Sequence, residues 1–254
     1  MERFLTTSFV PDGKVTSVLI AGNAPSKLLD YFQKKHIQYI LTAPSKSLAP
    51  PVSYHPDMQL FPCGNGRFIV TPERYHTYLN LIQNANFIKG NTTPSSTYPH
   101  DIAYNVARLK RYAFCNKKYL DTKVSAYLQS ENVKIMNVKQ GYAKCSVCIV
   151  NSRAVITADK GLHSAVLSAG FDSLLIRPGY VSLPGYDYGF IGGCSGLIAP
   201  DKLLFCGDIT KHPDFTKIAA FCKLQETELE WIDALPLTDI GSIIPLTQQR
   251  EDVV

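Results

Sequence analysis

The feature that most constrains the fold of this chain is an internal repeat. Five segments align without gaps, and each combines a short apolar run with a following residue that can cap a helix. Four of the five begin with Lys or Arg, and successive copies start 42 to 50 residues apart. The segments are SVLIAGNAP (17–25), RFIVTPERY (67–75), RYAFCNKKY (111–119), RAVITADKG (153–161) and KLLFCGDIT (202–210). A period of this length indicates one supersecondary unit repeated along the chain.

The residues around each copy predict the same elements in the same order. After each copy, apolar residues three and four apart predict a helix, and a short apolar run predicts another strand. Before four of the copies a further strand is predicted, and these strands start at His55, His100, Lys144 and Gly192. The first copy lacks such a strand, whereas Ile240–Leu246 predicts a strand without a neighbour in sequence. We therefore expect this last strand to pair beside Val18–Ala21 and to complete the first unit.

Five ββαβ units joined in this way predict an α/β fold, a five-bladed α/β propeller with the units around a pseudo-fivefold axis. Closing the ring removes a sheet edge, as closed β architectures generally do. Each unit needs its neighbours to bury its apolar face, so we expect a single domain over residues 1–254. With 45% hydrophobic residues, a chain of this length can bury a sizeable core.

The composition indicates which partners and which cellular compartment to expect. The net charge of +5 has one local concentration, at residues 108–118, without the interleaved exposed aromatics of a nucleic-acid site. Seven cysteines is an odd number for a disulfide framework, which favours reduced thiols and a cytoplasmic location. No apolar stretch approaches the roughly 18 residues of a membrane span, and the first residues do not resemble a signal peptide. We expect no membrane or nucleic-acid partner, and the sequence fixes no oligomeric state.

Equivalent positions of a closed ring face the same axis, so the repeat predicts which side chains meet. Counting back from the cation that opens each copy, and allowing for the hairpin turns, aligns residues from four units, and the C-terminal strand supplies the fifth. The predicted ring consists of Asp57, Asp101, Cys145, Cys194 and Ser242. His55 lies two residues before Asp57 and is expected on the same strand face.

These residue types together suit one kind of chemistry. Two carboxylates can hold a planar cation by paired hydrogen bonds, a thiolate can attack its central carbon, and a histidine can transfer protons. A purely structural interpretation is also open, because Asp at a strand start is often a turn residue and Cys is often a small buried apolar residue. The coincidence of these types at one ring position is the argument for function.

Several strings in the sequence resemble a known family. SYHPDMQLF, YPHDIAYN, QGYAKCSVCIV, YGFIGGCSG, GDITKHPD and DIGSIIP resemble an uncharacterised bacterial domain family of the pentein fold, and the likeness extends from about Val18 to Leu246. That fold is shared by enzymes that modify guanidino groups, including arginine and agmatine deiminases, dimethylarginine hydrolases and amidinotransferases. The resemblance implies a histidine acid–base, carboxylates that hold the guanidinium, and a late cysteine nucleophile.

Carried onto this chain, the resemblance gives His55 the acid–base role and Asp57 and Asp101 the substrate carboxylates. Cys194 follows Gly192-Gly193 late in the chain and is the nucleophile by position, although the enzymes usually have a His before that Cys and this chain does not. Cys145 has an equally good ring position and is the alternative thiol.

The function implied is hydrolysis or transfer on a small cationic guanidino or amidino compound through a Cys-linked adduct. Neither a metal nor an organic cofactor is expected. The alternative is a non-catalytic pentein that binds a ligand or a macromolecule, as the ribosome anti-association factor of the same fold does.

Overall fold

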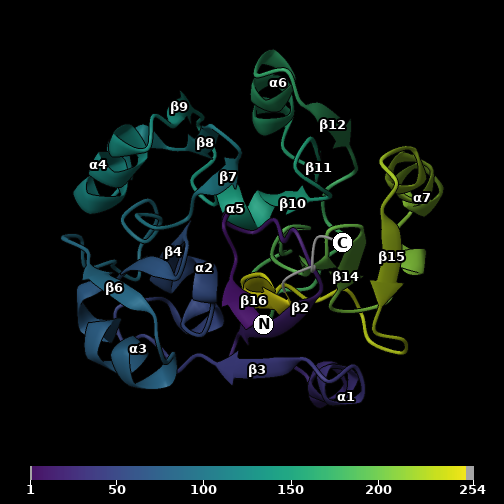
Figure 1. Cartoon of the computed structure of the whole chain (residues 1–254). Coiled ribbons are helices and arrows are strands. Elements are labelled where there is room, and N and C mark those ends of the chain that lie inside the picture. Colours follow the sequence, from purple (N-terminus) through teal and green to yellow (C-terminus); the bar gives the residue numbers. More distant parts are fainter. Residues whose placement is uncertain (1, 250–254) are drawn as a thin grey trace, which may run out of the picture.

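A computed structural model describes residues 2–249 of the chain. Five small sheets are set around a common centre, and the longer helices lie on the outside (Figure 1). Four of the sheets have three strands each, and the fifth has four. The arrangement brings segments from distant parts of the sequence together at the centre, where strands β2 (Val15–Ile20) and β16 (Ile244–Gln249) lie.

One unit illustrates how the repeat folds. Strand β10 (Val147–Ile149) pairs antiparallel with β11 (Ala154–Thr157), which pairs parallel with β12 (Asp172–Leu175). A parallel pair needs a crossover connection, and here helix α6 (Lys160–Ser168) provides it. The side chain of Asp159 begins this helix by accepting a hydrogen bond of 2.7 Å from the backbone N–H of Leu162.

Three other sheets have the same strand order and the same outer helix. Their elements are β4 (Leu60–Gly64), β5 (Arg67–Val70), α3 (Tyr75–Leu81) and β6 (Asn86–Lys89); β7 (Ala107–Leu109), β8 (Tyr112–Cys115), α4 (Thr122–Ser130) and β9 (Lys134–Asn137); and β13 (Ser195–Ala199), β14 (Lys202–Phe205), α7 (Phe215–Leu224) and β15 (Glu228–Trp231). The described residues also contain four short 3₁₀ turns, at Pro50–Val52, Pro72–Arg74, Lys117–Tyr119 and Ile209–Lys211. The strand–strand–helix–strand order predicted from the repeat is therefore present in each of them, with the first two strands antiparallel and the second and third parallel.

The two ends of the chain build the remaining sheet. Strand β2 pairs parallel with β3 (Gln38–Leu41) across helix α1 (Ser26–Lys34), and antiparallel with β16 from the far end of the sequence. The expected pairing of the last strand with the first unit is confirmed, although β16 begins at Ile244 and not at Ile240. An additional strand, β1 (Glu2–Phe4), pairs with the other edge of β16 and was not predicted.

The predicted starts of the inner strands are wrong in a way that matters for the site. Residues around Asp57 and Cys145 form short helices, α2 (Pro56–Gln59) and α5 (Ala143–Ser146), and the strands begin only after them. Pro56 occupies the first helical position, where its fixed φ favours a helical turn and its missing N–H costs nothing. The argument that His55 and Asp57 share a strand face is therefore wrong, because His55 precedes a helix that carries Asp57.

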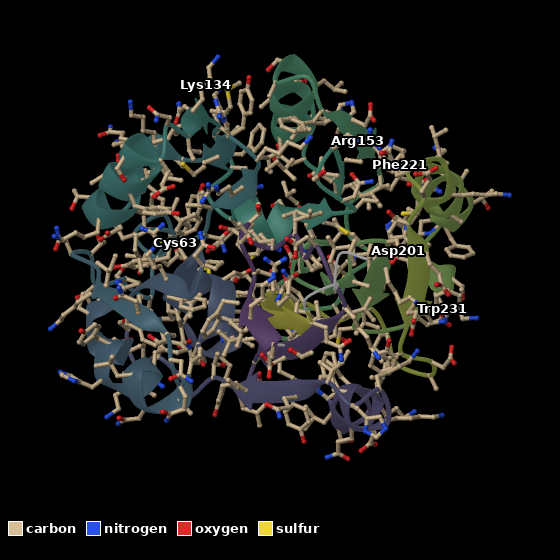
Figure 2. The ribbon with its side chains drawn as sticks, in the orientation of Figure 1. Cys63, Lys134, Arg153, Asp201, Phe221 and Trp231 are labelled. Carbon is tan, nitrogen blue, oxygen red and sulfur yellow. The ribbon has the colours of Figure 1, made fainter. Side chains whose placement is uncertain are left out.

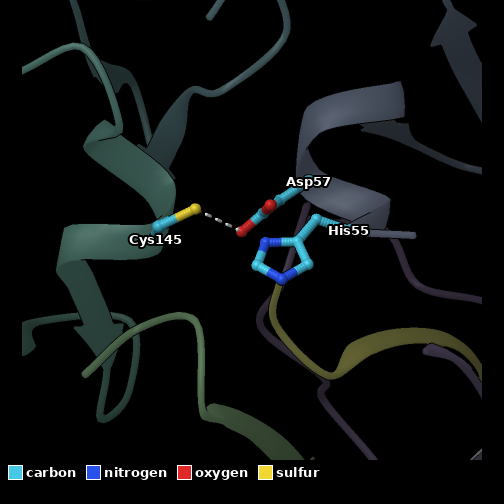
Figure 3. Close-up of side chains that lie close together, drawn as sticks. All are labelled: His55, Asp57 and Cys145. Carbon is cyan, nitrogen blue, oxygen red and sulfur yellow. Dashed lines mark hydrogen bonds between the residues drawn. The ribbon is translucent and has the colours of Figure 1, made fainter. Parts of the chain in front are cut away.

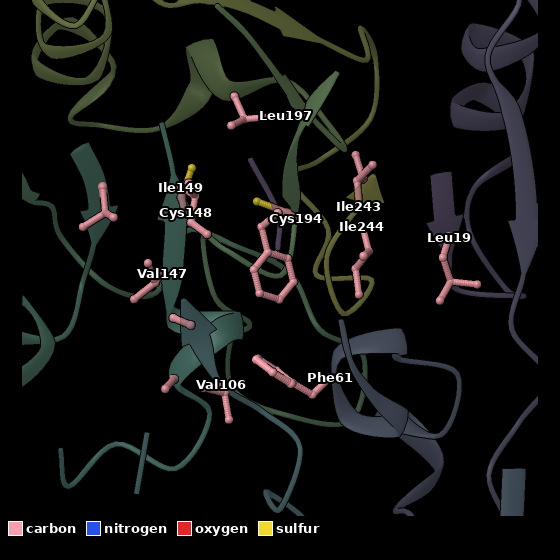
Figure 4. Packing of buried hydrophobic residues seen from close by; sticks show 14 of the residues in the cluster. Leu19, Phe61, Val106, Val147, Cys148, Ile149, Cys194, Leu197, Ile243 and Ile244 are labelled. Carbon is pink, nitrogen blue, oxygen red and sulfur yellow. The ribbon is translucent and has the colours of Figure 1, made fainter. Parts of the chain in front are cut away.

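Apolar side chains from several units fill the space between the sheets. Figure 4 shows Leu19, Phe61, Val147 and Cys194, from four different units, packed in one buried cluster. Charged side chains such as Lys134 lie at the periphery (Figure 2). All seven cysteines are buried free thiols. None of the described helices combines the length and the apolar character needed to cross a bilayer.

Candidate active site

A cavity of about 210 Å³ lies beside the helices α2 and α5. Its lining includes three buried residues with polar side-chain atoms, His55, Cys145 and Asp239. We call these three, together with Asp57, which is hydrogen-bonded to Cys145, the floor. Met58 and Phe190 form apolar wall, and the exposed residues Tyr186, Asp187 and Tyr188 lie at the rim. No Lys or Arg among the described residues lines this cavity, so its charged groups are carboxylates.

A thiol and a carboxyl group meet at the floor. Cys145 on α5 donates a hydrogen bond from Sγ to Asp57 Oδ2 on α2, with a distance of 3.1 Å (Figure 3). The ring of His55 lies beside them, and one atom from each of the three side chains falls within 4.8 Å of the others. Asp57 and Cys145, 88 positions apart in sequence, are thus brought into contact by two short helices from different units.

Asn105, which the sequence analysis did not single out, fixes the position of the thiol. Its side-chain N–H₂ donates to Cys145 Sγ at 3.1 Å and to the backbone carbonyl of Asp57 at 3.3 Å. Its Oδ1 accepts hydrogen bonds from the backbone N–H of Lys144 at 2.6 Å and of Cys145 at 3.3 Å. These are N–H groups of the first turn of α5, which lack partners within a helix. Asn105 therefore caps α5 from a different unit and orients Cys145 at the same time.

Ser242 and Lys144 lie on the other side of Asp57. Ser242 donates from Oγ to Asp57 Oδ2 at 2.6 Å, and Lys144 donates from Nζ to Ser242 Oγ at 2.9 Å. The backbone of Ser242 has φ +79°, a value uncommon for residues with a side chain. The preceding Gly241, at φ +69°, packs so closely that an added Cβ would lie 2.3 Å from the Cβ of His55. This tight turn brings the hydroxyl to Asp57.

Asp239 faces His55 across the floor. Asp239 accepts hydrogen bonds of 2.9 Å from the backbone N–H groups of Phe190 and Gly241, and its Oδ1 lies 3.8 Å from His55 Nδ1. His55 Nδ1 has no hydrogen-bond partner among the described residues. An unpaired buried nitrogen beside a thiol is available to a ligand or to a proton in transit.

Burial controls the protonation of these groups. It lowers the pKa of His55 to about 4, although Asp57 and Asp239 oppose the shift. It raises the pKa of Asp239 to about 6 and the pKa of Asp57 above its usual range. Burial, together with the nearby Asp57 and Asp239 carboxylates, raises the pKa of Cys145 well above 9.0. At neutral pH the site therefore holds a neutral imidazole and a protonated thiol, and the contact between His55 and Asp239 is not an ion pair.

These pKa shifts predict that two substitutions change the pH dependence of the free energy of unfolding in opposite directions. The lowered pKa of His55 contributes stability that is lost as the pH falls from 6.5 through about 4. The raised pKa of Asp239 contributes stability that is present below 3.8 and is lost as the pH rises through about 6. Relative to the unchanged protein, we expect His55→Asn to gain stability as the pH falls from 7 to 4.5, and Asp239→Asn to lose it. Urea denaturation at both pH values measures the difference, and parallel curves for all three proteins would contradict the prediction.

Two of the predicted ring residues lie away from the floor. Asp101 is buried, and its Oδ2 accepts a hydrogen bond of 2.6 Å from the hydroxyl of Tyr142, whose ring lines the cavity. Cys194 lies in the apolar core, where its Sγ donates to the carbonyl of Ile191 at 3.2 Å (Figure 4). The structure thus brings together His55, Asp57, Cys145 and Ser242, but not Asp101 or Cys194.

The floor also contains a set of atoms that suits a metal ion. His, Cys and a carboxylate are the ligand types of zinc sites, and the atoms of His55, Asp57 and Cys145 lie within 4.8 Å of one another. The thiol would have to lose its proton to bind a metal, in competition with its hydrogen bond to Asp57. A divalent cation that bound here would be held by these three residues.

Lys144, Asn105 and Asp239 were not predicted as site residues. Lys144 precedes Cys145 directly, and Asp239 comes three residues before Ser242, so both were close to aligned positions. Asn105 lies in the YPHDIAYN string, between the aligned Asp101 and the strand. The alignment of the repeats predicts one site residue per unit, whereas a helical turn presents several neighbouring residues to the centre.

Comparison with solved structures defines the class of fold. The amidinotransferase StrB1 from Streptomyces griseus matches with a TM-score of 0.58 and 11% identity, over 99% of this chain and 98% of that one. The amidinotransferase SxtG from Microseira wollei matches with a TM-score of 0.56 and 8% identity, over 90% and 91% of the two chains. The DDAH from Pseudomonas aeruginosa gives 0.55 and 8%, over 93% and 100%. This chain therefore has the pentein-type α/β fold of guanidino-modifying enzymes.

Sequence comparison defines the family more narrowly. The family model described as a family of unknown function, DUF6873, matches residues 19–244, and the chain belongs to that family. No curated protein sequence matches the chain significantly.

Proposed function

We propose that this protein is a hydrolase or transferase that acts on a small guanidino or amidino cation, with Cys145 as the nucleophile. The observation that carries the proposal is the meeting of Cys145, His55 and Asp57 within 4.8 Å at the floor of a cavity without basic lining residues in the described chain. The fold adds support, because a DDAH was solved with citrulline and a dimethylarginine dimethylaminohydrolase as an adduct with S-methyl-L-thiocitrulline.

The charges of the site suit a cationic substrate. Asp239 lines the cavity, and Asp57 Oδ1 accepts no hydrogen bond from the described residues. Each carboxylate can accept N–H groups of a planar cation, and the ring of Phe190 offers an aromatic wall beside it. Asp101 would act indirectly, by holding the hydroxyl of Tyr142. We assign the substrate carboxylates to Asp57 and Asp239 on this basis.

A bound cation would also activate the nucleophile. The two carboxylates that raise the pKa of Cys145 would be neutralised by the cation, which favours the thiolate. The thiol proton then passes to the neutral imidazole of His55. The Asp239 carboxylate lies 3.8 Å from Nδ1 of His55 and the Asp57 carboxylate within 4.8 Å of the ring, so the imidazolium formed in this step is stabilised.

The reaction would proceed in two halves. The sulfur of Cys145 forms a bond to the central carbon of the substrate, and His55 returns its proton to the departing nitrogen as the carbon–nitrogen bond breaks. The amine leaves, and an S-linked amidinium remains on the enzyme. Water or a second amine then attacks this carbon, His55 takes up its proton, and the carbon–sulfur bond breaks to release the product and restore the thiol.

The proposal predicts that a positive charge on an alkylating reagent accelerates its reaction with Cys145. Chloroacetamidine is a planar cation and chloroacetamide its neutral counterpart, and both lose chloride to a thiolate. We expect chloroacetamidine to modify Cys145 at least about 10-fold faster than chloroacetamide at pH 7. The carboxylates of the site bind the cation, and the bound cation favours the thiolate form of Cys145. Peptide mass spectrometry identifies the modified residue. Asp239→Asn is expected to reduce the preference.

Two results would oppose the proposal. Equal rates for both reagents would remove the role of the cation, and modification of Cys194 in place of Cys145 would move the nucleophile. A panel of guanidino compounds, assayed for released amine and ureido product, tests turnover directly. Binding of these compounds without turnover would favour the alternative of a non-catalytic binding protein.

We also infer that the five units form a closed five-bladed propeller that behaves as a single domain over residues 1–254. The pairing of β16 with β2 supports closure, because it joins the last strand of the chain to the first unit. The seven free thiols support a reducing compartment such as the cytoplasm.

A further inference from the structure

The wall of the cavity between the floor and the rim is apolar. Leu48, Val52, Met58 and Leu183 are buried and pack with Cys145 as an apolar cluster separate from the main core. Three members of this cluster, Val52, Met58 and Leu183, also line the cavity. Their side chains therefore face the space that a ligand would fill, and an apolar group in that space would extend the packing of the cluster.

Aromatic rings continue this wall toward the rim. The rings of Tyr142 and Phe190 pack against the cluster with their centres 5.9 Å apart, and the ring of Tyr188 lies 6.1 Å from that of Phe190. The hydroxyl of Tyr142 already donates to Asp101, at 2.6 Å, so what Tyr142 offers the cavity is its ring. A ligand that extends from the floor to the rim thus passes mainly carbon atoms.

The charge at the rim has the same sign as the carboxylates of the floor. Above the floor, the one charged side chain among the described lining residues is that of Asp187, which is exposed. It forms no ion pair with a described Lys or Arg. A carboxylate on a ligand would therefore find no cation along the wall and would meet a like charge at the rim. An unpaired carboxylate is strongly disfavoured in apolar surroundings.

We propose that the substrate carries its guanidinium or amidinium group on a short apolar chain or ring without a carboxylate, and that the apolar wall determines this specificity. The inference rests on the proposed function for the cationic end and deepens it by specifying the other end. At about 210 Å³ the cavity is smaller than the roughly 300–1,000 Å³ of typical small-molecule sites, so the chain is short. A second positive charge is not required, because an exposed ion pair with Asp187 would contribute little.

The experiment compares ligands that share a guanidinium and differ at the other end. The compound n-butylguanidine ends in a methyl group, and 4-guanidinobutyrate has a carboxylate in its place. We expect n-butylguanidine to bind at least about 10-fold more tightly at pH 7. From methylguanidine to n-butylguanidine, the affinity is expected to rise roughly fourfold for each methylene that is buried. Isothermal titration calorimetry with the Cys145→Ser protein, in which the proposed turnover is blocked, measures these affinities.

Substitutions in the same protein test the wall and the rim separately. Phe190→Ala removes one ring of the wall and is expected to reduce the gain per methylene. Phe171→Ala is the matched control, because Phe171 is partly buried against Tyr112 and does not line the cavity, and it is expected to keep the full gain. Asp187→Lys reverses an exposed charge and is expected to bring n-butylguanidine and 4-guanidinobutyrate at least threefold closer in affinity.

Three results would overturn the inference: equal or tighter binding of 4-guanidinobutyrate, an affinity that does not rise with chain length, or no binding of any of these compounds. The binding series does not need turnover. If the compounds bind in the expected order but the unchanged protein converts none of them, the proposed function fails and this specificity stands. Conversion of 4-guanidinobutyrate in preference to n-butylguanidine would refute the specificity and leave the proposed chemistry intact.

Discussion

Replacing Cys145 by Ser is expected to lower turnover of a guanidino substrate on the order of 10⁴-fold or more, as removal of a covalent nucleophile does in other enzymes. The hydroxyl is slightly smaller than the thiol and can still donate a hydrogen bond to Asp57, but it is a much weaker nucleophile at neutral pH. Steady-state assays on the compounds of the guanidino panel, together with intact-protein mass spectrometry for the covalent adduct, measure the loss.

Cys194→Ser is the matched control for this experiment. Cys194 is also a buried thiol, but its neighbours are core residues such as Leu197 and not the floor of the cavity. We expect the control to retain most of the turnover and the adduct, and both to persist in EDTA. Turnover that survives Cys145→Ser and is lost in Cys194→Ser would return the nucleophile to the late cysteine that the resemblance implied.

Ile244→Asp is expected to unfold the protein. Ile244 is fully buried in β16, opposite Leu19 of β2, at the seam where the last strand joins the first unit. An unpaired carboxylate at this position costs several kcal/mol, a large part of the roughly 5–15 kcal/mol that stabilises a typical domain. Near-ultraviolet circular dichroism and urea denaturation report the loss.

Gln249→Asp is the control on the same strand. Gln249 is exposed at the end of β16, so introducing Asp there is expected to change the free energy of unfolding by no more than about 0.5 kcal/mol. If Ile244→Asp left the unfolding transition in place, the last strand would not be needed for the fold, and the inference of a closed ring would fail.

The repeat predicted the order of the elements because each unit has the same burial requirements. A strand with both faces covered, such as β5, reads as a continuous apolar run, and the helix beside it has apolar residues on one face. The same alignment predicted that Asp57, Cys145 and Ser242 would meet. Positions related by a ring begin near one centre, so these three residues could meet although two of them lie on helical turns and not on strands.

The alignment could not predict how each residue reaches the centre. Asp57 and Cys145 are carried by helical turns, while Cys194 lies directly before β13 with its side chain in the core. The late position of Cys194 after two glycines therefore did not identify the thiol that lines the cavity, which is that of Cys145. Asn105 was missed because its value lies in hydrogen bonds to residues 40 and 48 positions away, which no local pattern encodes.

The polar network at the centre takes one or more groups from every sheet unit. Asp57, Asn105, Lys144, the carbonyl of Gly192 and Ser242 are linked in it by hydrogen bonds, and they span most of the chain. Since synthesis proceeds from the N-terminus, a nascent chain that has not yet emerged past Ser242 cannot assemble this network, however many of its sheets have formed. A growing chain thus carries the thiol of Cys145 for some hundred residues before the serine that bridges Lys144 and Asp57 exists.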